Sequence, residues 1–266
     1  MCTLILGVSV VAPGTVILGA NRDEDPARPS DPPGVLRERP RVIGGRDRRA
    51  GGTWLAVRER RAVVALLNRR DPAGAPGVRS RGLLTLETAA APEDTGTPRD
   101  VSADVLPAAA TPLARGVLGF ATDALRRDRY APFSLVFASH EVCWLLVNDG
   151  DAAPRVVPIA QGWHVLTHTE LDDPNEPRAA RLMRELQDAR PRSREEADAL
   201  LAEVLREHGD GAAVCIHAGR MQTVSSTRVW LAAGEARLEH VEGRPCEREA
   251  VDLSALLADR QEAERR

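Results

Sequence analysis

The chain contains no lysine, and all 36 of its basic residues are arginine. Schiff-base catalysis and the phosphate-binding lysine of a Walker loop are therefore excluded, and no glycine-rich phosphate loop is present. The 39 acidic residues nearly balance the arginines. No overall charge attracts nucleic acid or an anionic membrane surface.

Cysteine is also scarce. The four cysteines, Cys2, Cys143, Cys215 and Cys246, are scattered and form no CxxC pair. This spacing argues against a zinc site, and against a disulfide framework in a reducing compartment. Cys143 and Cys215 lie within apolar, strand-like runs, so we predict that they are buried packing residues. We expect neither a metal nor a cofactor.

Long apolar runs are missing too. No stretch approaches the ~18–20 uninterrupted apolar residues of a membrane-spanning helix. The N-terminus lacks a basic segment followed by an apolar core and a cleavage site, and polar residues 21–24 end its apolar run. We therefore expect a cytoplasmic protein without integral membrane association. A hydrophobic content of 43% and the lack of a convincing boundary predict a single domain over residues 1–266.

Short β-type runs dominate both halves of the sequence. A turn signal at residues 12–14 predicts a hairpin, and a charged turn at 58–61 predicts a second one. The strands of these hairpins are expected at residues 3–11 and 15–20, and at 53–57 and 62–67. A meander is expected at 134–138, 142–147, 156–158 and 164–167, and another at 214–217, 222–225 and 227–232.

Helical spacing of apolar residues separates these groups of strands. Helices are predicted at residues 80–91, 112–127, 178–189 and 193–207, and a terminal helix at 252–266. The charges of 178–207 are interpreted as solvated helix faces, and 71–78 and 89–112 as surface loops. The order strands, helices, strands, helices, strands does not alternate like a doubly wound parallel sheet. It favours an α+β fold with antiparallel sheets covered by helices, as in a layered αββα domain.

Residue 2 is the strongest candidate for a catalytic residue. Methionine aminopeptidases remove Met1 when the next residue is small, as Cys2 is. Removal would leave a thiol nucleophile and a free α-amine on one carbon. An α-amine with a pKa of ~7.7–8.0 suits a general base at neutral pH, which is the arrangement of N-terminal Thr and Cys nucleophiles.

Four polar motifs follow at predicted strand ends. They are Asn-Arg-Asp-Glu at 21–24, Gly-Gly-Thr-Trp at 51–54, Asn68, and Ser-Ser-Thr-Arg at 225–228. With Met1-Cys2, they resemble the NRDE family, also called the transport-and-Golgi-organisation family, over residues 1–70, 134–182 and 213–231. That family is similar in turn to bile-salt hydrolase and penicillin V acylase. The resemblance implies a four-layer αββα N-terminal-nucleophile hydrolase-like sandwich that cleaves amides through an N-terminal cysteine.

The resemblance also implies a role for individual residues. Cys2 would be the nucleophile, and Asp23 would accept a hydrogen bond from its α-amine. Asn68 would donate to the tetrahedral oxyanion, a contact whose loss typically costs ~10²–10³ in rate. Arg228 would be a cation that lowers the pKa of the thiol.

Two positions depart from the acylase pattern. The acylases carry an arginine three positions before the motif Asp, where this chain has Ala20. Arg22 would have to supply that charge, although neighbouring residues on a strand face opposite sides. The acylases carry Asn at a second oxyanion position, where this chain has His168. An imidazole can donate through a ring N–H or act as an acid or base near pH 7.

Three interpretations of the function remain open. The first is a cysteine hydrolase of a small-molecule amide or related acyl substrate, with a thioester intermediate. The alternative is a non-catalytic protein that binds or moves haem or a lipid-related metabolite, with Cys2, His168 and His217 as candidate iron ligands. A hydrolase fold that lost its activity and serves as a scaffold is a third interpretation. Arginines in predicted loops 25–50 and 69–80 suggest an anionic ligand group, although solvated loop arginines are the simpler explanation.

Overall fold

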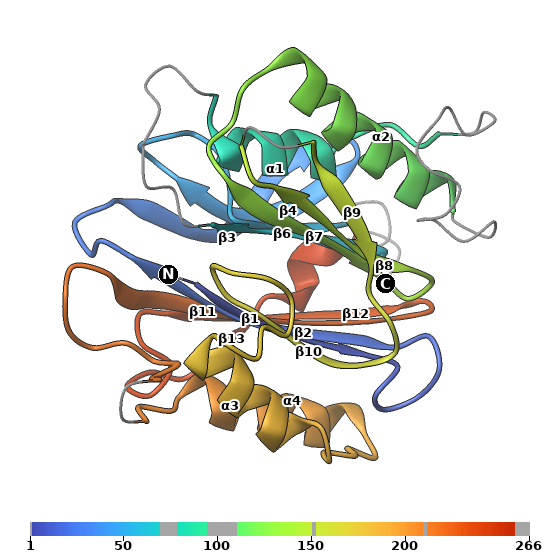
Figure 1. The fold of residues 1–266 in the computed structure, drawn as a ribbon. Coiled ribbons are helices and arrows are strands. Elements are labelled where there is room, and N and C mark those ends of the chain that lie inside the picture. Colours follow the sequence, from blue (N-terminus) through green and yellow to red (C-terminus); the bar gives the residue numbers. More distant parts are fainter. Residues whose placement is uncertain (1, 70–78, 95–110, 151–152, 210–211, 259–266) are drawn as a thin grey trace.

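Two antiparallel sheets form the centre of the structure, a computed structural model that describes residues 2–69, 79–94, 111–150, 153–209 and 212–258. The sheets pack face to face, and a pair of helices covers the outer face of each (Figure 1). The first sheet has six strands in the order β10-β1-β2-β11-β12-β13, and the second has seven in the order β3-β4-β5-β6-β7-β8-β9. The predicted α+β, four-layer αββα architecture is confirmed.

The strands of each sheet come from distant parts of the chain. The first sheet contains β1 (Thr3–Val8), β2 (Val16–Glu24), β10 (Gly162–Leu166), β11 (Gln222–Ala232), β12 (Glu235–Glu242) and β13 (Val251–Asp252). The second contains β3 (Ser30–Glu38), β4 (Arg41–Asp47), β5 (Leu55–Arg58), β6 (Ala62–Asn68), β7 (Phe133–Ser139), β8 (Cys143–Asn148) and β9 (Arg155–Pro158). The hairpins predicted at the first and second turn signals are β1–β2 and β5–β6.

In the described ranges, each of the four α-helices is preceded by a residue whose side chain caps its first turn. The helices are α1 (Arg81–Ala89), α2 (Pro112–Arg127), α3 (Pro177–Leu186) and α4 (Arg194–Leu205). Their first turns are capped by Ser80, Thr111, Glu176 and Ser193, whose side chains accept a backbone N–H. Such caps stabilise a helix start by about 1 kcal/mol. None of the helices in the described ranges is long and apolar enough to cross a bilayer.

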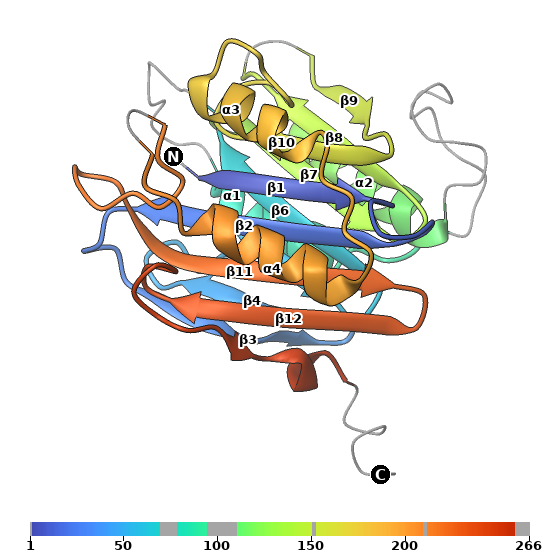
Figure 2. The ribbon, with the colours of Figure 1, turned by 90° about the horizontal axis from the view of Figure 1, so that it is seen from below.

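The pleat of β1 sends alternate side chains into two different layers. Leu4 and Leu6 lie in the apolar core between the sheets, whereas Ile5 lies in the core beneath α3 and α4. Figure 2 shows these two helices over the outer face of the first sheet. Because successive residues of a strand face opposite sides, Cys2 faces the second sheet, as Leu4 does.

The sequence predicts the wrong neighbours for several strands. Residues 164–167 do not complete the meander, because β10 pairs with β1 in the first sheet. Residues 222–232 form one continuous strand, and 214–217 form none. The unpredicted β12 pairs with β11 instead. Local patterns predict a strand, but its sheet is decided by long-range pairing.

Two predicted irregular segments also differ. The predicted loop 25–50 contains the β3–β4 hairpin, whose prolines 32–33 lie in an edge strand with a register shift. Proline is tolerated there because an edge strand leaves some N–H positions unpaired. The terminal helix is reduced, within the described residues, to one 3₁₀ turn at Ser254–Leu257. The loop predicted at 71–78 lies outside the described residues.

The Gly-Gly-Thr-Trp motif allows α1 to pack closely on the second sheet. A Cβ at Gly52 would lie 2.1 Å from the backbone carbon of Gly82 and 2.3 Å from the Leu83 nitrogen. We expect Gly52→Ala to force these segments apart and to lower the free energy of unfolding by about 1–3 kcal/mol. Chemical denaturation measures this change.

Gly119 on α2 is the matched control. Among the described residues, no atom lies within 4 Å of a Cβ placed there. Gly119→Ala should therefore stabilise the helix by about 0.5–1 kcal/mol. Equal stabilities for the two variants would contradict the packing described for Gly52.

Candidate active site

Cys2 lies at the start of β1, at one end of the space between the two sheets. Its half-buried side chain lines a cavity together with residues from both sheets, among them Arg22 on β2 and Trp54 and Leu67 of the second sheet. The cavity has a volume of about 20 Å³, enough for a single water molecule. Cys2 therefore lies at a small cavity between the two sheets.

Strand pairing sets the neighbours of Cys2. Thr3 pairs with Asn21 on β2, and Leu4 pairs with Leu166 on β10. Extending the first pairing by one residue places Arg22 beside Cys2, and extending the second by two residues places His168 on its other side. The candidate residues therefore gather at one end of the first sheet.

The environment of Cys2 raises the pKa of its thiol. Burial raises the pKa of Cys2, and the charge of Asp23 raises it further. A hydrogen bond from the Asp23 backbone and the charge of Arg22 oppose this rise. Because thiolate is the reactive form, a nearby base is needed before this thiol can attack.

Asp23 is buried on the opposite face of the first sheet, towards α3. The residue as a whole is only 3% exposed. Thr223 on β11 donates its hydroxyl to Asp23 Oδ1 over 2.7 Å, and the guanidinium of Arg178 lies 3.8 Å from Oδ2. Burial raises the pKa of Asp23 to about 6, although both of these contacts lower it. The carboxyl group is therefore held in place and close to titration at neutral pH.

Arg178 was missed by sequence reasoning, which placed it on a solvated helix face. The structure corrects this: Arg178 is buried at the start of α3 and donates to Thr3 Oγ1 over 2.7 Å. The sequence held a signal, because Leu182 and Leu186, four and eight residues on, occupy the buried face of the same helix. A buried carboxyl group in the sheet below requires such a partner.

Arg22 faces the cleft, on the side of Cys2 and opposite to Asp23. Its guanidinium lies 4.3 Å from the centre of the Trp54 ring and 3.7 Å from Glu24. Stacking on an aromatic ring stabilises a cation at such distances. The charge of Arg22 is thus one of the influences that lower the pKa of the Cys2 thiol.

Asn21 supports the site structurally. Its side-chain amide donates to the carbonyl of Leu205, at the end of α4, over 2.9 Å and to that of Val214 over 3.0 Å. These bonds tie β2 to the segment between α4 and β11. The first residue of the Asn-Arg-Asp-Glu motif therefore holds the segment that precedes Thr223.

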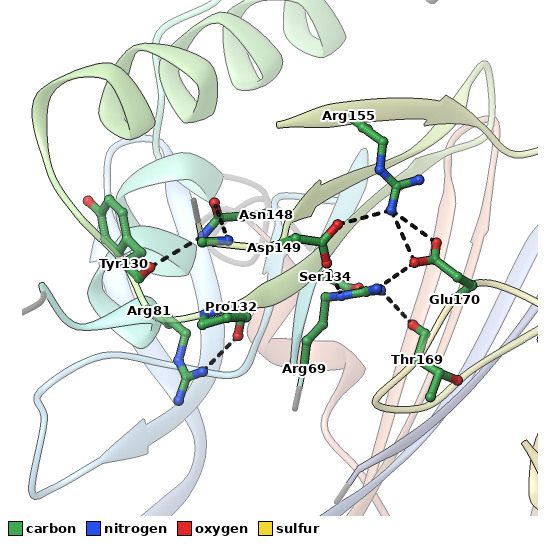
Figure 3. Close-up of polar contacts among 11 residues, drawn as sticks. Arg69, Arg81, Tyr130, Pro132, Ser134, Asn148, Asp149, Arg155, Thr169 and Glu170 are labelled. Atoms are coloured by element: carbon green, nitrogen blue, oxygen red, sulfur yellow. Dashed lines mark hydrogen bonds and ion pairs between the residues drawn. The ribbon is translucent and has the colours of Figure 1, made fainter. Parts of the chain in front are cut away.

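A cluster of charged groups around Arg69 and Glu170 joins the two sheets (Figure 3). Arg69, which follows Asn68, donates to the carbonyl of Thr169 over 2.7 Å and to Asp149 over 2.8 Å. Thr169 in turn follows His168. The cluster therefore brings the ends of β6 and β10 together.

Asn68 and His168 differ in their exposure. Asn68 is exposed at the end of β6, opposite Phe133, and is not among the residues that line the small cavity. His168 is buried. The predicted oxyanion roles of both residues remain predictions.

Arg228 lies elsewhere. It is opposite Gly19 on β2, faces α4, and forms ion pairs with Asp198 at 2.7 Å and with Glu239. The charges that act on Cys2 include Arg22 rather than Arg228. The predicted effect of Arg228 on the thiol is therefore not supported, because two carboxylates already hold this guanidinium on the other face of the sheet.

The three candidate haem ligands do not form one group. Cys2 and His168 lie at the same end of the first sheet, whereas His217 contacts Cys246 and the ring of His208. No observation in the described ranges places His217 with the other two.

Comparisons with known proteins agree with this fold. Residues 1–222 match the family model described as Transport and Golgi organisation 2, and no curated protein matches the chain significantly. The solved structure of a Caenorhabditis elegans N-acylethanolamine-hydrolyzing acid amidase ortholog aligns with a TM-score of 0.52 at 18% identity, covering 98% of this chain and 97% of that chain. A mutant conjugated bile acid hydrolase from Clostridium perfringens aligns with a TM-score of 0.43 at 11% identity, covering 95% and 96%. The N-terminal-nucleophile hydrolase fold predicted from the sequence is confirmed.

The raised pKa of Asp23 predicts a pH-dependent stability. The native state binds the Asp23 proton more tightly than the unfolded chain, in which the pKa is 3.8. The resulting stability is complete below pH 3.8 and is lost as the pH rises through about 6. Relative to Asp23→Asn, the wild type should lose about 2 kcal/mol of unfolding free energy between about pH 4 and pH 7.

Urea denaturation of both proteins across this pH range measures the difference. The mass of the protein in the same samples shows whether Met1 has been removed. This matters because removal would leave an ammonium group on Cys2, which would lower the pKa of Asp23. Thr223→Val removes a donor to the carboxylate and should move the transition to higher pH. Parallel stability curves for the wild type and Asp23→Asn would show that the carboxyl group is not buried as described.

Proposed function

The chain belongs to the Transport and Golgi organisation 2 family, and from this we propose that it is a cysteine hydrolase of an amide or related acyl bond. One observation carries the proposal. The Cys2 side chain lines the cleft between the sheets, and the buried carboxyl group of Asp23 is close enough for its charge to raise the pKa of the Cys2 thiol. Removal of Met1 would free the α-amine of Cys2 to act as the base. This amine would lie next to the Cys2 thiol, which is the nucleophile, and next to the Asp23 carboxylate, which accepts its hydrogen bond.

The reaction proceeds in two halves. The Cys2 thiol passes its proton to its own α-amine, and the sulfur attacks the substrate carbonyl carbon. The tetrahedral intermediate collapses as the ammonium returns the proton to the leaving amine, which leaves a thioester on Cys2. Water, deprotonated by the α-amine, then attacks the thioester and releases the acid and the free thiol.

Asp23 positions the base. Its carboxylate accepts a hydrogen bond from the α-amine, and Thr223 and Arg178 keep that carboxylate in place. Without this contact, a chain terminus would rarely hold its reacting atoms at the ~3–3.5 Å required for attack. Asp23 therefore acts on the orientation of the amine and on its proton affinity.

The developing oxyanion would be stabilised from the ends of β6 and β10. Asn68 and His168 supply an amide and an imidazole N–H, and Arg22 supplies a positive charge on the cleft side. The cluster around Arg69 holds the first two segments together. Donors fixed before the reaction stabilise the transition state most strongly.

The substrate class follows from the cleft lining and from the structural neighbour. The cavity is lined by apolar side chains such as Leu4, Leu55 and Leu67, which suit an acyl group. The acid amidase of similar fold is named for its hydrolysis of N-acylethanolamine. We therefore propose a small-molecule N-acyl amide as substrate, and a cytoplasmic location for the reaction.

Intact mass spectrometry and single-turnover acylation test this proposal. The purified protein should lack Met1, and incubation with a panel of activated N-acyl amides should add one acyl group to Cys2. Cys2→Ala should show no acylation. Hydrolysis by this variant should fall by at least ~10³-fold, as expected for loss of a nucleophile.

Two further proteins serve as controls. Cys143→Ala removes a thiol that is buried in the same inter-sheet core, and it should acylate like the wild type. A form with an uncleaved N-terminal extension should be inactive, because its Cys2 lacks a free amine. An unprocessed wild-type protein, or full activity in Cys2→Ala, would refute the mechanism.

A further inference from the structure

Four metal-binding side chains converge behind the first sheet. His208 follows α4, Cys215 and His217 precede β11, and Cys246 lies between β12 and β13. One ligand atom from each residue lies within 4.8 Å of all the others. Their scattered spacing argued against a zinc site in the sequence, but the fold brings them together.

The distances match a tetrahedral site. Zinc bonds of ~2.3 Å to sulfur and ~2.0–2.1 Å to nitrogen imply separations of about 3.8 Å between two sulfurs and about 3.6 Å between sulfur and nitrogen. The Cys215 and Cys246 sulfurs are 3.5 Å apart. Nε2 of His217 lies 3.6 Å from the first sulfur and 3.1 Å from the second. The first two distances lie within about 0.3 Å of the edges of that tetrahedron, and the third is about 0.5 Å shorter than its edge.

The surroundings of His217 fit the same interpretation. Its Nδ1 lies 3.7 Å from the carboxylate of Glu247, while its Nε2 faces the two sulfurs. A histidine ligand commonly presents its second ring nitrogen to a carboxylate, which sets the tautomer and the ring orientation. Arg244 holds the same region by donating to Glu247 over 2.9 Å and to Gln222 over 2.8 Å.

We propose that these four residues form a structural site for one zinc ion, with two thiolate and two imidazole ligands: His208, Cys215, His217 and Cys246. A tetrahedral set of two sulfurs and two nitrogens favours zinc over the hard cations. Four protein ligands fill the coordination shell, so the site leaves no position for a substrate. Binding releases the thiol protons and leaves two thiolates that neutralise the charge of the ion.

The zinc site would support the candidate active site from behind. The backbone of Ile216, between two ligands, donates to Thr223 Oγ1 over 2.8 Å and accepts from the Thr223 backbone over 2.9 Å. Thr223 in turn donates to Asp23. Asn21 holds Val214, next to the first cysteine ligand. Zinc would therefore fix the segment that positions Asp23, but its binding does not require that the protein be a hydrolase.

Metal analysis of the untagged, reduced protein tests the proposal. Inductively coupled plasma mass spectrometry should find one zinc ion per chain. Removal with a chelator should lower the unfolding temperature, and added zinc should restore it. After removal, Co²⁺ titration should saturate at one ion per chain with the visible bands of tetrahedral cobalt and a thiolate-to-cobalt charge-transfer band.

Ligand variants assign the site. Cys246→Ser should lose about half of the charge-transfer intensity, because one of two thiolates is gone, and should retain less zinc through purification. His217→Ala should also retain less zinc but should keep both thiolates. Cys143→Ala, which removes a buried thiol distant in the fold, should keep one zinc ion per chain.

Three results would overturn the proposal. They are a reduced wild-type protein that takes up neither Zn²⁺ nor Co²⁺, a zinc content that the ligand variants leave unchanged, and a metal-free Cys215–Cys246 disulfide in protein purified under reducing conditions. The cobalt titration uses the wild type, so it gives an answer even if a variant fails to fold. Zinc binding with an inactive Cys2 would refute the proposed hydrolase function and leave the zinc site intact.

Discussion

The rest of the candidate site depends on one buried carboxyl group, that of Asp23. Removing a carboxylate from water is costly unless it is paired and hydrogen-bonded. Its partners come from different layers: Thr223 from β11 of the same sheet and Arg178 from α3 above it. The carboxyl group is therefore held only when the first sheet and its helices are assembled, which links the geometry of the site to the completed fold.

The alternation of side chains along β2 divides the Asn-Arg-Asp-Glu motif between two faces. Asn21 and Asp23 face the helices. Asn21 holds the segment before β11, and Asp23 accepts a hydrogen bond from the Thr223 hydroxyl. Arg22 faces the cleft and stacks on Trp54. The motif thus combines a support layer behind the sheet with a charged residue in front of it. Cys2 lies between the two, with its thiol on the cleft side.

Both proposals share one structural segment. Asn21 holds Leu205 and Val214, and Thr223 holds Ile216. Three of the four proposed zinc ligands also lie between α4 and β11. A metal bound there would stabilise the back of the sheet.

The sequence by itself determined the local elements and the nucleophile candidate. Proline and helical spacing predicted α2 at its observed bounds, the turn signals predicted two hairpins, and Met1-Cys2 with the strand-end motif predicted the family and its layered fold. Only the tertiary structure decided that β10 joins the first sheet, that Arg178 is buried beside Asp23, that Arg228 is held by other carboxylates, and that Cys215 and Cys246 meet. These features rest on contacts between residues far apart in the chain. Local periodicity determines which face of an element is apolar, but not which distant residue lies against it.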